Sequence, residues 1–167
     1  METDTTRIPP LPQHQEGQER QDQQHKSFQQ SPQHGEKYHW HRQTIAETFE
    51  RIQCDPLHPW VAIGDFLDDW RFTERQDRGE LVQESIAPAG ENPELQRWAA
   101  FCAAMVEWLC WQDGMPFPSW TARDAYRLAE PWFLYPGDLL RAWQLATTPT
   151  PFKMRNIFGG DHMLARA

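Results

Sequence analysis

The residues best suited to chemistry are two pairs of carboxylates. Glu47 and Glu50 lie three residues apart, and Asp65 and Asp68 have the same spacing. Such a spacing places both carboxylates of a pair on one face of a helix. Two pairs on neighbouring helices can together bind Mg²⁺ and activate water for attack on a phosphoanhydride. The pattern therefore indicates magnesium-dependent hydrolysis as one function to consider.

This arrangement loosely resembles the paired carboxylate elements of all-α nucleotide pyrophosphohydrolases. The resemblance implies a small Mg²⁺-dependent enzyme with Glu47, Glu50, Asp65 and Asp68 as its catalytic residues. The chain departs from that pattern at the third position, which holds Asp where the family has Glu. No lysine or arginine of the stretch has an obvious place for a phosphate, and carboxylates three apart are frequent on any exposed helix. We therefore keep hydrolysis as the alternative function and assign no cofactor and no metal site.

A further candidate is a single carboxylate within the least polar stretch of the chain. Glu107 is the only charged residue between Trp98 and Trp111. A carboxylate in such surroundings must be paired, lie on a narrow exposed stripe, or shift to its neutral form. A recognition or catalytic role in an aromatic-lined pocket is the functional alternative, and the sequence leaves these options open.

These side chains need helices to position them, and one helix is signalled at both ends. Asn92 is a suitable N-cap before Pro93, and Asp113-Gly114 is a suitable end, so we expect a helix over about residues 93–112. Because this helix is apolar around most of its circumference, it should be buried. Other stretches also have helical spacing, and none has the alternation of a strand. We expect further helices over about residues 44–53 and 59–78 and one that begins at Asp138, with Leu139, Leu140, Trp143 and Leu145 as its apolar positions. We predict an all-α fold, a four- to five-helix bundle around this central helix.

The beginning of the chain differs from the rest in composition. Nine glutamines lie between Gln13 and Gln33, interleaved with charged residues, serine and histidine. Such a segment has too little apolar surface to offset the entropy lost on ordering. We predict a disordered Gln-, Pro- and His-rich leader over residues 1–43 and a single all-α domain over residues 44–167.

The charge balance constrains the partners. The formal net charge is -8, and residues 44–167 hold eleven Lys and Arg against eighteen Asp and Glu. An acidic domain disfavours nucleic acid and favours basic protein surfaces. The three cysteines make no even disulfide framework, and no apolar run is long enough to span a bilayer. We therefore expect a cytoplasmic protein with no membrane partner.

Aromatic residues are abundant in the second half of the chain, and they have two interpretations. They either pack short elements onto the central helix or form a protein-binding surface. For the second case, the expected anchors are Trp132, Phe133, Trp143, Phe152 and Phe158. The remaining predicted partner-binding residues are charged: Asp65, Asp68, Asp69, Glu107 and Arg155.

Several segments between residue 59 and the C-terminus resemble those of small bacterial all-α proteins that look like antitoxins or companions of a neighbouring toxin. They are WAAFCAAMVEWL, EPWFL, PFKMRNIF and the final LARA. The matching residues of the ending are Phe152, Arg155, Asn156, Ile157, Phe158, Leu164 and Arg166. The resemblance implies a non-enzymatic module that binds a protein, such as a basic toxin-like one. The cationic ending either docks on the acidic face around Asp65, Asp68 and Asp69 or inserts into the partner.

Overall fold

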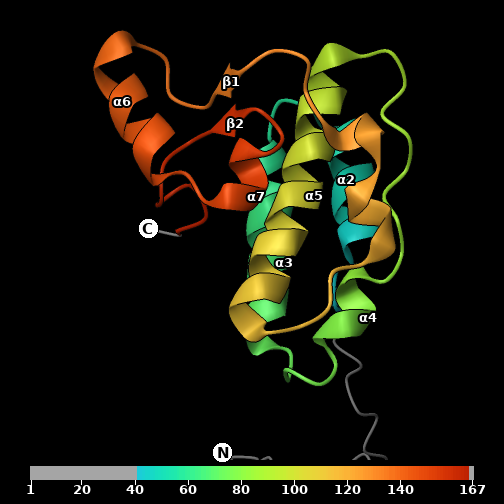
Figure 1. The fold of residues 1–167 in the computed structure, drawn as a ribbon. Coiled ribbons are helices and arrows are strands. Elements are labelled where there is room, and N and C mark those ends of the chain that lie inside the picture. The colour runs from blue at the N-terminus through green and yellow to red at the C-terminus, as the bar shows by residue number, and fades with distance from the viewer. Residues whose placement is uncertain (1–40, 166–167) are drawn as a thin grey trace, which may run out of the picture. The chain divides into compact units, whose positions relative to one another are not determined.

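The computed structural model describes residues 41–165, and most of these residues are helical (Figure 1). The elements are, in chain order, α2 (Ile45–Cys54), α3 (Pro59–Phe72), α4 (Arg78–Val82), α5 (Pro93–Asp113), the 3-10 turns η1 (Ser119–Ala122) and η2 (Asp124–Tyr126), β1 (Trp132–Phe133), α6 (Asp138–Thr147), α7 (Thr150–Lys153) and β2 (Ile157–Phe158). The predicted leader lies outside the described residues except for its last three positions. Gln43 is buried and donates from Nε2 to the Ala62 carbonyl over 2.9 Å, so the packed domain already includes this residue.

Local capping determines where α2 begins. The Thr44 side chain accepts from the Glu47 backbone, while the Glu47 carboxylate accepts from the Thr44 backbone. This reciprocal pair satisfies two backbone donors that a helix start leaves open. Ile45, Phe49 and Ile52 then follow at helical spacing, and all three are fully buried.

The central helix is confirmed as α5, Pro93–Asp113, with Asn92 as its N-cap. Gly114 ends the helix in the left-handed conformation, at a φ of 61° that glycine adopts without strain. Eleven residues of α5 are buried. α2, η1, η2 and α7 all pack against this helix, and α3 packs against α2 (Figure 1). The mostly helical prediction is thus confirmed, while the regular bundle stays a prediction.

Besides its helices, the described part of the chain has two short strands, β1 and β2. These strands have two residues each and pair in parallel, with Trp132 opposite Ile157 and Phe133 opposite Phe158. Strands of this length show no period-2 pattern, so the sequence did not indicate them. The pairing attaches the segment that precedes α6 to the segment that follows α7.

No helix among residues 41–165 has the length and hydropathy that crossing a membrane requires.

Candidate functional site

Two of the four carboxylates of the hydrolase alternative make well-defined contacts within the fold. Glu47 caps α2, and the hydrogen bond from the Thr44 backbone lowers the pKa of its carboxyl. Asp65 accepts from Arg51 Nη2 over 2.8 Å across the α2–α3 contact. Within the described part of the chain, no three His, Cys, Asp or Glu side chains form a group that could hold a metal ion. The geometry therefore gives the hydrolase alternative no support.

The three aspartates of α3 are half-buried, and each has a contact within the domain. Besides the Arg51–Asp65 pair, Asp68 lies 3.6 Å from Arg71, and Asp69 accepts from the Gln43 backbone over 2.7 Å. Asp65 thereby connects α3 to α2 and Asp69 connects it to the start of the domain, while the Asp68 pair lies within α3. These three aspartates would contribute negative charge to a binding surface, since each already has a contact within the domain.

Glu107 forms a two-pronged salt bridge with Arg155. The Glu107 Oε1 atom lies 2.7 Å from Arg155 Nη2, and Oε2 lies 2.9 Å from Nη1. Arg155 also donates to the carbonyls of Thr121 and Pro151, over 2.8 and 2.9 Å. The two side chains are only 13% and 6% exposed, so this charge pair is largely removed from water.

This pair answers one question that the sequence left open and bears on a second. Glu107 is paired, which was one of the three options for a carboxylate in that helix. Arg155 of the cationic ending docks on α5. Arg166 lies outside the described residues. Glu107 and Arg155 therefore connect the C-terminal segment to the central helix and offer little surface to a partner.

The five aromatic residues expected as anchors have different environments. Phe152 is fully buried, with its ring centroid 5.1 Å from that of Phe101. It is a core residue and cannot contact a partner unless the core opens, so its assignment as an anchor is corrected. Trp132 is half-buried and packs edge-on against Trp98. Phe133 and Phe158 are half-buried and stack on each other with centroids 5.1 Å apart.

Two side chains fix α6 to the rest of the domain. Gln144 is fully buried and forms a pair of hydrogen bonds with the Tyr135 backbone, of 2.9 and 3.2 Å. The Trp143 ring lies directly against Gly160, where a Cβ atom would overlap it. The helix is therefore held in a defined position, although it packs closely against none of the other helices among residues 41–165 (Figure 1).

The opposite side of α6 carries an apolar stripe that faces solvent. We call Leu139, Ala142, Leu145 and Ala146 the α6 stripe; all four are exposed, and Leu139 is 98% exposed. Their spacing places them on one side of the helix. The sequence had indicated leucines at helical spacing here, which is the pattern of a face that packs on a core. That pattern does not reveal that Trp143 and Gln144 are the residues of α6 that contact the rest of the domain.

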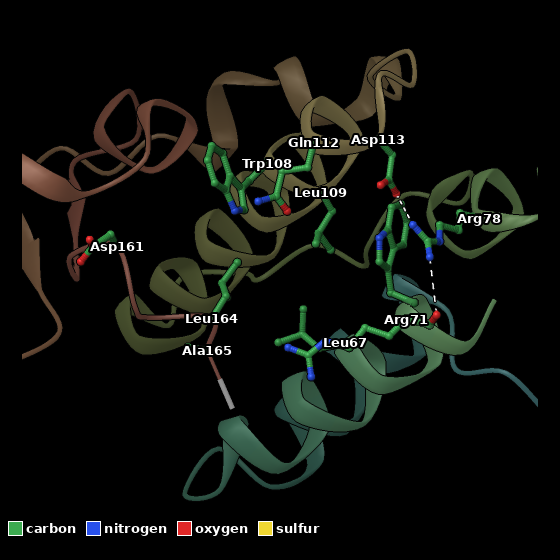
Figure 2. Close-up of a pocket in the computed structure, with 11 residues that line it drawn as sticks. Leu67, Arg71, Arg78, Trp108, Leu109, Gln112, Asp113, Asp161, Leu164 and Ala165 are labelled. Carbon is green, nitrogen blue, oxygen red and sulfur yellow. Dashed lines mark hydrogen bonds and ion pairs between the residues drawn. The ribbon is translucent and has the colours of Figure 1, made fainter. Parts of the chain in front are cut away.

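A separate pocket lies between α3, the C-terminal end of α5 and the segment after β2, and we call it the α3–α5 pocket (Figure 2). Its volume is about 380 Å³. Leu67 and Leu109 form an apolar floor, and the Trp108 indole and Leu164 stand beside it (Figure 2). This volume falls within the range of small-molecule sites.

Polar groups surround this apolar floor. The most firmly held is Arg78, which donates to Asp113 over 2.6 Å and lies over the Trp70 ring at 5.5 Å. Arg71 and Gln112 line the same pocket, and both residues are exposed to solvent there. The pocket thus offers a guanidinium and an amide as donors beside an aromatic wall.

The cysteines offer no reactive site in α5. Burial raises the pKa of the Cys102 thiol to about 12. Burial, together with the nearby carboxylates of Asp113 and Glu107, raises the pKa of Cys110 to about 11. Both thiols therefore stay protonated at neutral pH and behave as small core residues.

Comparison with known proteins adds no family to this description. No family model matches the chain, and no curated protein or solved structure was found to be similar to it. Function is therefore inferred from the geometry, the charge and the sequence.

Proposed function

We propose that this chain is a non-enzymatic module that binds another protein through the α6 stripe. The observation that carries the proposal is the exposure of Leu139 and its neighbours on a helix that the fold holds in place. Contiguous exposed apolar residues on a folded protein are typical of an interaction site. A helix whose anchors recur every three to four residues fits an apolar groove on a partner.

The energetics favour such an interface. Burying one leucine side chain contributes about 1.5–3 kcal/mol. Gln144 and Trp143 already fix the helix, so little conformational entropy is lost when it docks. Phe133 and Phe158, stacked beside the α6 region, would form the half-buried edge of the interface; Arg141 of α6 lies over the Phe133 ring at 5.0 Å.

The charge of the domain supports a basic partner. Residues 41–165 hold eleven Lys and Arg against eighteen Asp and Glu, and the α3 aspartates belong to this excess. Opposite charges accelerate the encounter of this domain with a basic protein. Like charges disfavour the binding of acidic proteins, including a second copy of this chain. With the resemblance of the ending to toxin companions, we propose an antitoxin-like role in the cytoplasm, in which the partner is a basic toxin-like protein.

Photo-cross-linking in the native cell tests this function. A photoreactive phenylalanine analogue at position 139 is compared with the same analogue at position 57, because Leu57 is a matched leucine, 84% exposed and in the loop between α2 and α3. We expect one basic protein to cross-link to position 139 and not to position 57. The same protein, once purified, should form a stoichiometric complex with the full chain.

Either of two results would contradict the proposal. One is that both positions give the same products, or that neither gives any. The other is that the purified protein cross-linked at position 139 fails to bind the full chain in solution.

A further inference from the structure

We propose that the α3–α5 pocket binds a small aromatic carboxylate. This site is separate from the α6 stripe, and the inference does not depend on the proposed protein-binding function. It follows from three properties of the pocket: its aromatic and aliphatic lining, its exposed cationic donor, and the acidic groups that surround that donor (Figure 2).

The lining selects a flat apolar ligand. Leu67 and Leu109 supply an aliphatic floor, and Leu164 faces them from the C-terminal segment (Figure 2). The Trp108 indole is half-buried and already stacks on Trp111 at a centroid distance of 5.0 Å, which fixes its orientation. A ring placed against this indole gains both apolar burial and the favourable geometry of aromatic pairs.

The donors select a carboxylate on that ring. Arg71 is 52% exposed at its side chain, and its ion pair with Asp68, at 3.6 Å, is longer than a hydrogen bond. Its guanidinium can therefore donate two parallel hydrogen bonds to a ligand carboxylate. The amide of Gln112 provides a further donor from α5. Arg78, in contrast, is already engaged by Asp113 and by the Thr73 carbonyl.

The acidic groups around Arg71 limit the charge of the ligand. Asp68 lies on the same helix, while Asp113 and Asp161 line the pocket from α5 and the C-terminal segment. The repulsion from these carboxylates grows with the charge of the ligand, so a phosphate dianion meets about twice the repulsion that a carboxylate monoanion meets. The pocket therefore fits one carboxylate better than a phosphate.

Indole-3-acetate and indole-3-acetamide form a matched pair of probes, because they share one ring and differ in the charge of one group. Their binding to the full chain is followed by NMR titration of leucine methyl groups. We expect indole-3-acetate to saturate with a Kd of about 1 mM or tighter, as a ligand of this size allows. The amide should bind at least about tenfold more weakly, since charge-assisted hydrogen bonds are the stronger kind. The methyl signals of Leu109 and Leu164 should shift, and those of Leu139 on α6 should not.

Arg71→Gln tests the assigned donor, and Arg97→Gln is its control. Arg97 is likewise a helical arginine with a partner three residues away, and its side chain is 47% exposed. We expect the preference for the acid over the amide to fall below about twofold in Arg71→Gln and to persist in Arg97→Gln. The proposal is overturned if neither probe saturates below about 10 mM, where even a weak small ligand fills its site. It is also overturned if both probes bind equally, if the preference survives Arg71→Gln, or if the shifts fall outside the pocket of the wild-type protein.

Discussion

Replacing Glu107 with leucine removes one half of the buried salt bridge that connects α5 to the C-terminal segment. Arg155 would keep its hydrogen bonds to the carbonyls of Thr121 and Pro151 but would lose both bonds to the carboxylate. Its Nε atom already has no partner among the described residues. The substitution thus leaves a cation, 6% exposed at its side chain, without a counter-charge.

The expected cost is large relative to the stability of a small domain. Removing one member of a buried ion pair costs about 3–5 kcal/mol. The whole free energy of unfolding of such a domain is about 5–15 kcal/mol. Because two carbonyls still accept from the guanidinium, we expect the lower end, about 3 kcal/mol, for Glu107→Leu. The double variant Glu107→Leu/Arg155→Met should recover at least about half of this loss, because neither charge is then left alone.

Urea unfolding of the full chain measures these differences, with the slope of the transition checked for constancy. Arg97→Met is the control for an ion pair on the surface, since Arg97 and Glu94 are both about half exposed and such pairs contribute only about 0–1 kcal/mol. If Glu107→Leu costs no more than Arg97→Met, or if the double variant is as unstable as the sum of the single ones, the pair does not stabilise the domain in the manner described.

Two other outcomes follow from the same geometry. Gly160→Ala should destabilise the domain by about 2 kcal/mol more than Gly90→Ala in urea unfolding. Both glycines have a positive φ, but only a Cβ at position 160 overlaps the Trp143 indole of α6. Equal losses of stability in the two variants would contradict the described docking of α6. At pH 8 a thiol reagent should modify the exposed Cys54 rapidly and leave Cys102 and Cys110 unmodified until urea unfolds the chain, because the raised pKa values of these two thiols keep them protonated. Mass spectrometry of peptides gives the rate of modification of each cysteine. Rapid labelling of the two α5 cysteines in the native protein would refute this prediction.

Local signals in the sequence were sufficient for the central helix and for α2. Capping depends on residues within one turn of a helix end, so Asn92, Pro93 and Gly114 marked the limits of α5 to within a residue. The end of α3 was harder to predict. Helical spacing continued to about residue 78, but Thr73 is extended and donates its hydroxyl to the Asp69 carbonyl, which ends the helix at Phe72.

Contacts between distant residues could not be predicted from spacing. The partner of Glu107 is 48 residues away, and only the folded chain shows that Arg155 is that partner. The α6 stripe was missed for a related reason. An amphipathic pattern indicates a helix with an apolar face, but it does not show whether the rest of the chain covers that face. Here Gln144, a polar residue, is buried, while Leu139 is not.

The most direct test of the central claim is the affinity of the full chain for the protein that cross-links to position 139. Calorimetric titration compares the wild type with Leu139→Asp and Leu57→Asp, two substitutions at exposed leucines that leave the core intact. We expect Leu139→Asp to weaken binding by at least about tenfold, which corresponds to the loss of about 1.4 kcal/mol, and Leu57→Asp to leave it within about twofold. Equal affinities for the two variants would contradict the assignment of α6 as the binding surface.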